Sequence, residues 1–220
     1  MDTVVIDIDG TLLDSNYHHC LAWSRAFQTY DVSVPVVRIH RALGMGGDRL
    51  VTHVAGQQVE EAHGDDVRDR WEKEYDAIIG ETRLFAGARD LLHACRRRGL
   101  RVALASSAIP RHAEHALELL DAEELADGWT TSEDADESKP APDLLDEALA
   151  RVDGNAAVMV GDAVWDVEAA TAQGLPTIGL LSGGVGRAEL LEAGAVAVYA
   201  DPGDLADHLD EALAQAGSRR

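Results

Sequence analysis

The stretch TVVIDIDGT, residues 3–11, decides the fold class because it places two acids at the end of an apolar run. Its first six residues are β-branched and almost wholly apolar, which is typical of a parallel strand buried on both faces. If the strand extends far enough, side-chain alternation puts Asp7 and Asp9 on the same side of the chain. Ligands of open parallel sheets bind at the carboxyl ends of the strands, so these acids stand where a ligand is expected. Gly10 permits a tight turn beside such a ligand, and Thr11 adds a hydroxyl.

Similar apolar runs recur along the chain and alternate with helical patterns. The segment 87–99 has its apolar residues at helical spacing and ends at Gly99, which suits a helix C-cap. Alternating strands and helices predict a doubly wound parallel sheet of the α/β class. Further strands are expected at 101–107, 156–162, 176–181 and 195–200, with a short one near Trp129, and helices at 87–99, 110–125, 140–152 and 166–174.

One region interrupts this alternation between the first and second strands. From about Ser15 to Arg83 the sequence has no convincing strand and is dominated by helical segments. We therefore expect an all-helical cap domain at 15–83, inserted into an α/β core domain formed by 1–14 and 84–220. The linkers are expected near 14–17 and 82–86, and the cap helices at 20–30, 36–44, 48–56 and about 65–79.

The net charge limits the classes of partner. The 220 residues include 40 Asp and Glu against 19 Lys and Arg, which gives a formal net charge of -21. Such a surface repels nucleic acids and anionic membranes, so neither is expected as a partner. An anionic substrate must then be met by a local positive centre, such as a metal ion, a helix N-terminus or a few basic side chains.

The cysteines and the apolar segments indicate the compartment. Cys20 and Cys95 are isolated from each other and from any histidine cluster with zinc spacing, which predicts buried thiols in a reducing environment. No apolar stretch approaches the ~20 residues of a membrane-spanning helix, and the N-terminal segment lacks the pattern of a signal peptide. We therefore expect a soluble, cytoplasmic protein that is a monomer or a homodimer.

One further strand end and one loop carry side chains suited to a bound phosphate. Ser106 and Ser107 end the second expected strand, and their hydroxyl groups can donate hydrogen bonds at the same edge of the sheet. Lys139 lies in an acidic loop just before Pro140 and Pro142, which are typical of a helix start. The chain has two lysines, and a lysine in an acidic loop indicates that a compact positive charge is needed there.

Asp162 and Asp166 add a second pair of acids. Asp162 stands at the end of the fourth expected strand, and Asp166 lies one helical turn further on, so the two face the same way. Together with Asp7 and Asp9 they place four carboxylates at one edge of the sheet. Carboxylate and carbonyl oxygens with open water positions suit Mg²⁺. The sequence therefore predicts a Mg²⁺ site in which all four aspartates take part.

In this order and spacing, DIDGT, the strand-end Ser106, SKPAPD and GDAVWD resemble the four motifs of the haloacid dehalogenase superfamily. The helical insert resembles the small cap of the phosphoglycolate phosphatase and β-phosphoglucomutase branch, and the resemblance covers essentially the whole chain. It implies a Rossmann-like core and a Mg²⁺-dependent phosphatase. Such an enzyme hydrolyses a small phosphorylated metabolite through an aspartyl-phosphate.

The resemblance also implies a role for each motif residue. Asp7 would be the nucleophile, and Asp9 would be the general acid and then the base. Ser106 and Lys139 would bind the phosphoryl oxygens, with backbone amides near Ser107 as further donors. Mg²⁺ would be held by the Asp7 carboxylate, the Asp9 backbone carbonyl and Asp162, with Asp166 supporting it directly or through water.

Two alternatives stay open. A sugar-phosphate mutase on the same scaffold is suggested by NYHHCLAW, in which His19 falls where the mutase has a cap-hinge histidine. Gly47 lies near the place of the mutase's cap arginine, and the fourth motif has the phosphatase-like form GDxxxD, so we favour hydrolysis. A non-catalytic binding protein is the other alternative, and the presence of every motif residue argues against it.

Substrate selection is expected from the cap, which would close over the site. Trp23 and Phe27, four residues apart, are predicted to belong to the hydrophobic core of the cap instead. The leading candidates for substrate contact are His19, Gly46, Gly47 and Arg49, followed by Tyr17, His18, Arg41, Met45 and Asp48.

Overall fold

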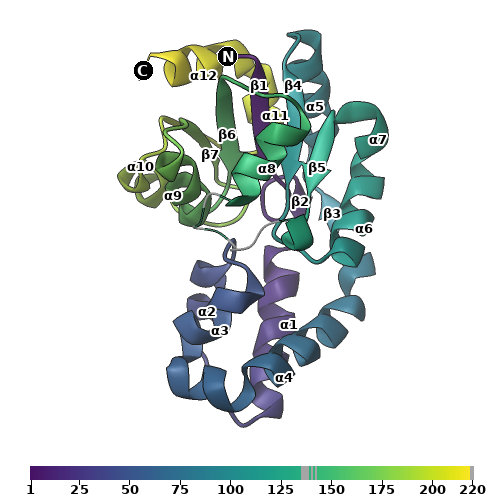
Figure 1. Ribbon diagram of the computed structural model, residues 1–220, viewed down its shortest axis with the longest axis vertical. Coiled ribbons are helices and arrows are strands. Elements are labelled where there is room, and N and C mark those ends of the chain that lie inside the picture. Colours follow the sequence, from purple (N-terminus) through teal and green to yellow (C-terminus); the bar gives the residue numbers. More distant parts are fainter. Residues whose placement is uncertain (135–138, 140, 142, 219–220) are drawn as a thin grey trace.

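The computed structural model describes residues 1–134, 139, 141 and 143–218. Its main sheet is parallel and has six strands in the order β5-β4-β1-β6-β7-β8 (Figure 1). The predicted doubly wound α/β sheet is confirmed, and each apolar run expected to form a strand does so. The strands are β1 (Thr3–Asp7), β4 (Arg101–Ala105), β5 (Gly128–Thr130), β6 (Ala157–Gly161), β7 (Thr177–Leu180) and β8 (Ala197–Tyr199).

Helices cover both faces of this sheet because successive side chains of a strand point to opposite faces. In β1, Val4 and Ile6 pack with α5, α6, α7, α11 and α12, whereas Val5 packs with α8 and α9. The helices are α5 (Ala88–Arg97), α6 (Pro110–Leu120), α7 (Ala122–Leu125), α8 (Asp143–Arg151), α9 (Val164–Ala172), α10 (Arg187–Ala193), α11 (Pro202–Asp207) and α12 (Leu209–Gly217).

The chain crosses from one half of the sheet to the other at β1. It builds β4 and β5 on one side of β1, and then β6, β7 and β8 on the other side. Asp7 lies opposite Ala105 of β4, and Ile6 lies opposite Val160 of β6. A crevice forms between strand ends at such a crossing point. The residues that follow β1, β4 and β6 therefore meet at one edge of the sheet.

Four helices form an insert between β1 and β4, drawn in purple to blue in the lower half of Figure 1. Trp23, Phe27, Leu50 and Tyr75 belong to a buried cluster formed by the insert alone, separate from the clusters that pack on the sheet. We call these four helices the helical insert. They are α1 (Asn16–Thr29), α2 (Val36–Ala42), α3 (Gly47–Ala55) and α4 (Gln57–Asp76).

The chain enters and leaves the helical insert through a short pair of strands. β2 (Leu13–Asp14) runs antiparallel to β3 (Arg83–Leu84). The first connecting segment is shorter than the expected linker at 14–17, because α1 already begins at Asn16. The two connections therefore lie side by side and are held together by backbone hydrogen bonds.

The helix expected at 20–30 begins at Asn16, and two further helical segments differ in extent from the sequence prediction. The long helix expected at about 65–79 begins at Gln57, directly after Gly56, whose φ of 90° separates α4 from α3. The helical pattern at 110–125 divides into α6 and α7, because Asp121 between them adopts a left-handed φ of 53°. In both cases a single backbone angle, which the apolar spacing does not reveal, sets the boundary.

The two cysteines are buried and unpaired, as predicted. Burial raises the pKa of both Cys20 and Cys95 to about 12, so neither thiol ionises readily. Within the described parts of the chain, no helix combines the length and the apolar character needed to cross a membrane.

Candidate active site

The chain turns sharply after Asp7, the last residue of β1. Gly10 adopts a φ of 80° in this turn. A Cβ atom at Gly10 would lie 2.3 Å from Nδ2 of Asn16 and 2.6 Å from Oδ2 of Asp162, which is too close for any side chain. Glycine is therefore required here so that Asp162, far along the chain, can approach the end of β1.

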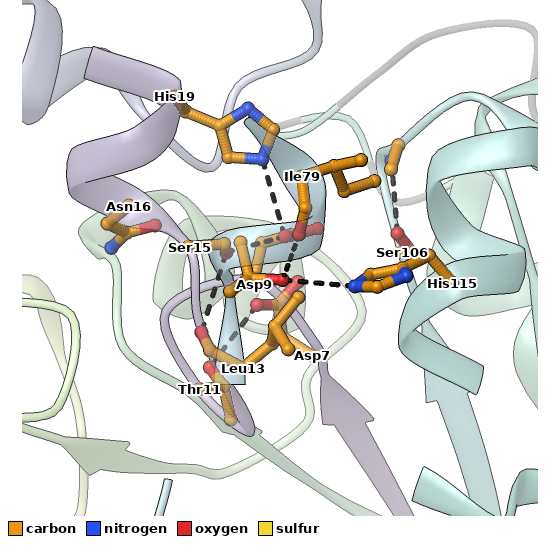
Figure 2. Close-up of polar contacts among 12 residues, drawn as sticks. Asp7, Asp9, Thr11, Leu13, Ser15, Asn16, His19, Ile79, Ser106 and His115 are labelled. Atoms are coloured by element: carbon orange, nitrogen blue, oxygen red, sulfur yellow. Dashed lines mark hydrogen bonds and ion pairs between the residues drawn. The ribbon is translucent and has the colours of Figure 1, made fainter. Parts of the chain in front are cut away.

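Asp7 and Asp9 point in different directions. The expectation that both lie on one side of the chain depended on the strand reaching Asp9, and β1 ends at Asp7. The carboxylate of Asp9 accepts a hydrogen bond from Oγ of Ser15 at 2.6 Å and lies 3.3 Å from Nε2 of His19 (Figure 2). Asp7 instead lies among the acids that follow β6. One aspartate therefore contacts the helical insert, and the other contacts the strand ends.

Asp7, Asp162 and Asp166 form a buried cluster of carboxylates. One oxygen atom from each lies within 4.8 Å of the other two. The hydroxyl of Thr11 lies 3.2 Å from Oδ2 of Asp7 and 2.9 Å from Oδ1 of Asp162, so it connects two of the acids. Oδ2 of Asp166 accepts a hydrogen bond from the amide of Ala163 at 3.1 Å. Asp166 therefore caps the start of α9 as well as joining the cluster.

Lys139 is the cation of this cluster. Its side chain is fully buried, and Nζ forms an ion pair with Asp7 and another, at 2.8 Å, with Oδ1 of Asp166. Burial alone would lower the pKa of Lys139, but the charges of Asp166 and Asp7 raise it, so the ammonium group stays protonated. The neighbouring Pro140 and Pro142, which the sequence analysis linked to the start of α8, lie outside the described residues.

The cluster holds more negative charge than Lys139 neutralises. Burial is the main cause that raises the pKa of Asp7, and the nearby Asp166 and Asp162 add to it while Lys139 opposes it. Burial and Asp166 raise the pKa of Asp162 to about 7. A further cation would stabilise the ionised form of these acids. Three carboxylates are a donor set that suits Mg²⁺, so the residues present fit a divalent metal ion.

The helical insert contributes to the lowered pKa of Asp9. Burial would raise the pKa of Asp9, but the contacts with His19 and Ser15 outweigh it and lower the pKa. The ring of His19 stacks on Tyr75 of α4, with 3.9 Å between the ring centroids. Because α1 and α4 together position His19, the insert supplies one of the contacts that lower the pKa of Asp9.

Ser106 and Ser107 both follow β4 but have different surroundings. Ser106 is buried, and its Oγ accepts a hydrogen bond from the amide of Ala108 at 3.1 Å (Figure 2). Ser107 lines the cavity in front of Asp7 and Asp9. In this conformation Ser107, more than Ser106, is exposed to a molecule bound in the cavity.

This cavity is small, about 60 Å³, and lies between the strand ends and the helical insert. The sheet side contributes Asp7, Asp9 and Ser107. The side formed by the insert includes the candidates His19, Met45, Gly46 and Gly47, together with apolar and aromatic side chains.

Other candidates for substrate contact lie away from the cavity. Arg49 is not among its lining residues, and its Nε lies 4.0 Å from the carboxylate of Asp48. Arg41 forms an ion pair at 2.9 Å with Glu189 of α10. Tyr17 is 62 % exposed. His18 is half-buried and likewise absent from the lining. Arg41 therefore connects the helical insert to α10, outside the cavity.

Asn16 belongs to the site although its sequence position gave no signal for it. Its Nδ2 donates to Oδ2 of Asp162 at 3.0 Å and to the carbonyl of Gly183 at 3.1 Å. Nε2 of His40 lies 2.8 Å from the same carbonyl. A Cβ atom at Gly183 would lie 1.6 Å from Oδ2 of Asp162, so the loop after β7 packs directly on this acid. In the sequence, the pair Gly183-Gly184 was the one indication that the backbone comes this close to Asp162.

Comparison with known proteins supports one family. Residues 1–174 match the model of haloacid dehalogenase-like hydrolases, and residues 137–212 match a related hydrolase model. Phosphoglycolate phosphatase of Rhodospirillum rubrum is 29% identical over 221 residues, which cover 94% of this chain and 90% of the relative. Tyrosine-protein kinase PtkA of Mycobacterium tuberculosis is 30% identical over 228 residues, which cover 96% of this chain and 72% of the relative.

A solved structure agrees with this assignment. The crystal structure of a hydrolase from Pseudomonas syringae has a TM-score of 0.90 and 30% identity, covering 96% of this chain and 99% of its own. The agreement extends through the helical insert, because nearly the whole of both chains is matched. Since the family model spans β1, the helical insert and the carboxylate cluster, the chain belongs to the haloacid dehalogenase-like hydrolases.

Proposed function

We propose that the protein is a Mg²⁺-dependent phosphatase that hydrolyses a small phosphorylated metabolite through an aspartyl-phosphate at Asp7. The observation that supports this most is the fully buried Lys139 between Asp7 and Asp166, within a cluster suited to a divalent cation. Catalysis of phosphoryl transfer depends mainly on positioning and on neutralising charge. The relative from Rhodospirillum rubrum is named a phosphatase, which agrees with hydrolysis.

In the first step the Asp7 carboxylate attacks phosphorus, the bond from phosphorus to the ester oxygen breaks, and the phosphoryl group becomes attached to Asp7. The ammonium group of Lys139 lies against Asp7 and neutralises charge on the phosphoryl oxygens. Asp9 gives its proton to the departing alkoxide. A bound phosphate dianion raises the pKa of Asp9 by like-charge repulsion, which favours the protonated form needed here.

In the second step a water molecule attacks the phosphorus of the acyl phosphate. Asp9, now ionised, takes the proton of this water, and the bond from phosphorus to Asp7 breaks to release inorganic phosphate. The contacts of Asp9 with Ser15 and His19 favour the ionised form that this step needs. The same carboxylate therefore serves as the acid of one step and the base of the next.

The carboxylates of Asp7, Asp162 and Asp166 and the backbone carbonyl of Asp9 would hold Mg²⁺. When bound, this ion neutralises negative charge on the cluster and on the phosphoryl oxygens. Thr11 and Asn16 each donate to one oxygen of Asp162, which fixes the orientation of that carboxylate.

The helical insert would act as a cap that opens and closes. A cavity of about 60 Å³ is small for a phosphorylated metabolite, so we expect the insert to move away when the substrate enters. The β2–β3 pair is where the chain passes between the two halves of the molecule and where such a movement would be centred. Closure then excludes bulk water from the reacting groups.

Release of inorganic phosphate from p-nitrophenyl phosphate, with Mg²⁺ and with EDTA, tests this proposal. We expect Mg²⁺-dependent release that Asp7→Asn lowers by more than ~10⁴-fold, because the attacking oxygen is replaced. Asp207→Asn, at an exposed aspartate of α11, is the matched control and leaves the rate unchanged. Labelled phosphate retained on acid-quenched wild-type protein, and not on Asp7→Asn, identifies the covalent intermediate.

Two results would contradict the proposal. Full activity of Asp7→Asn would show that another group attacks phosphorus. Conversion of glucose 1-phosphate into glucose 6-phosphate without phosphate release would identify a sugar-phosphate mutase instead.

A further inference from the structure

The helical insert presents an apolar and aromatic wall to the cavity. Trp23, Leu43, Met45, Leu50 and Trp71 contribute to its lining. The rings of Trp23 and Trp71 stack with 4.7 Å between centroids and 9° between their planes. In the proposed reaction the phosphoryl group lies against Asp7 and Lys139, so this wall faces the alcohol part of the ester. We call it the insert wall.

The insert wall includes a hydrogen-bond donor that the protein does not use. Nε1 of Trp71 is buried and has no hydrogen-bond partner among the described residues. A buried donor without a partner is unfavourable, and an oxygen atom of a ligand would satisfy it. This neutral N–H can bind a hydroxyl oxygen of the substrate, although it would bind a carboxylate oxygen equally well, so the discrimination against an anion rests on the charges around the wall.

The described part of the cavity lining offers no basic partner to a second anion. No lysine or arginine occurs among the described residues that line it. Lys139 is buried against Asp7 and Asp166, at the phosphoryl end of the site. The ring of His19 directs Nε2 to Asp9. A second anionic group, carried on the alcohol, would therefore lose its hydration without gaining a positive partner.

Arg68 lines the adjoining cavity together with Trp71, but its charge is already balanced. Its guanidinium contacts Glu60 at 2.7 and 3.1 Å and Asp65 at 2.8 Å. It also donates to the carbonyl of Gly47 at 3.3 Å. Two carboxylates surround one guanidinium, so Arg68 holds the start of α3 in place and offers no net positive charge to a substrate.

The start of α3 is another place where an anion could bind, because helix N-termini attract negative charge. Asp48 lies in the first turn of α3 and supplies a negative charge there. Asp48 and Glu72 also line the adjoining cavity. The surroundings of the insert wall therefore repel a second anion on the substrate.

We propose that the substrate is a phosphate monoester of an uncharged, hydroxyl-bearing alcohol, such as a sugar or a polyol, and that esters with a second anionic group are disfavoured. This inference rests on the proposed phosphatase function and adds the substrate class. The stacked indole rings and the unpaired Nε1 of Trp71 suit a hydroxyl-bearing alcohol, and acidic surroundings without a lysine or arginine among the described lining residues disfavour a second anion.

Pairs of esters in which a CH₂OH group is replaced by a carboxylate test this inference. One pair is ethylene glycol monophosphate and phosphoglycolate, and the other is glycerol 3-phosphate and 3-phosphoglycerate. We expect kcat/KM to be at least ~10-fold higher for the uncharged alcohol in each pair. Equal or higher kcat/KM for the carboxylates, with p-nitrophenyl phosphate still hydrolysed, overturns the substrate class alone. No hydrolysis of p-nitrophenyl phosphate overturns the proposed function itself.

A charge placed on the insert wall separates its effect from that of the net charge of -21. Met45→Lys adds a cation to the cavity lining, and Val37→Lys makes the same change of charge on an exposed site of α2. We expect Met45→Lys to raise kcat/KM for phosphoglycolate relative to ethylene glycol monophosphate by ~10-fold, and Val37→Lys to leave the ratio unchanged. Equal changes in both variants would assign the preference to net charge and overturn the inference.

Discussion

The two walls of the cavity differ in what they bury: one buries charged groups, and the other buries aromatic and aliphatic groups. The strand ends bury three carboxylates and a lysine within contact of one another. The insert wall buries aromatic and aliphatic side chains, and the arginine beside it is surrounded by carboxylates. The first wall can carry out charge-dependent chemistry because rigid parallel strands hold its groups. The second can select a substrate by shape and polarity, and those of its residues that do not contact Asp9 or Asp162 can be exchanged without disturbing the buried charges.

Loss of Lys139 should have the largest effect on turnover and on the free energy of unfolding, because the wall formed by the strand ends depends on its buried cation. We expect Lys139→Met to abolish turnover and to lower the free energy of unfolding by ~3–5 kcal/mol, since Asp7 and Asp166 would be left without their ion-pair partner. Urea unfolding measures the second effect. Lys73→Met, at an exposed lysine of α4, is the control and should change neither quantity.

A double variant shows whether repulsion between the acids causes this loss. Lys139→Met combined with Asp166→Asn removes a charge from each side of the ion pair, and we expect it to recover part of the lost stability without recovering turnover. If Lys139→Met alone were as stable as the wild type, the buried ion pairs would not hold the strand ends together.

The metal-free protein should lose stability as the pH rises. The pKa of Asp162 is about 7 in the folded state, against an ordinary value of 3.8. The folded protein therefore binds a proton that the unfolded protein releases between these values, so stability falls from about pH 5 to pH 7. Melting temperatures in EDTA at pH 5, 6 and 7 measure this slope. Saturating Mg²⁺, or Asp162→Asn, should flatten it, and an unchanged slope with either one would contradict the metal assignment.

Asn16→Ala should weaken metal binding through the orientation of Asp162. We expect ~10-fold weaker binding, because the variant removes the amide that fixes Oδ2 of this acid. Electron paramagnetic resonance of Mn²⁺ titrated into the protein measures affinity without turnover. Asn155→Ala, at an exposed asparagine, is the control. Equal affinity of Asn16→Ala and wild type would show that Thr11 alone orients Asp162.

The smallest effect on activity is expected from a substitution in the insert wall. Trp71→Phe keeps a ring in place but removes Nε1, so we expect KM for glycerol 3-phosphate to rise by about 2–10-fold. KM for p-nitrophenyl phosphate, whose leaving group has no hydroxyl, should not change, and the melting temperature should stay close to that of the wild type. Equal shifts in KM for both esters would point to ring packing instead of the donor.

The wall formed by the strand ends could be predicted from the sequence, and the side formed by the insert only in part, through His19, Met45, Gly46 and Gly47. Asp7, Ser107 and Asp162 each stand at or just beyond the end of a buried strand, and parallel strands bring such residues to one edge whatever their separation along the chain. Lys139 was predicted because the chain has two lysines and this one lies in an acidic loop. The same apolar runs gave all six strands of the main sheet, because central strands are buried on both faces.

The lining of the insert wall depends on how four helices cross, and helical spacing does not determine this. Trp23 was predicted to be a core residue, and it is buried, but it also lines the cavity. Trp71 was not predicted at all, and Arg49 was predicted but lies outside the lining. The contact of Asn16 with Gly183 joins residues that are 167 positions apart, so no local pattern could show it.

The β2–β3 pair makes the protein a two-part assembly with one junction. Leu13 lies opposite Leu84, and neighbouring strands are ~4.8 Å apart, so the helical insert leaves and returns at nearly the same point. A short turn could close this gap at little cost in loop entropy and leave the strand order and the ion pairs of Lys139 unchanged, while Asp162 would lose the hydrogen bond from Asn16. Exchange of the insert at this junction, with Asn16 and His19 retained at the start of α1, would then offer a different alcohol pocket to the same phosphoryl-transfer site, so new specificity could evolve by recombination as well as by point mutation.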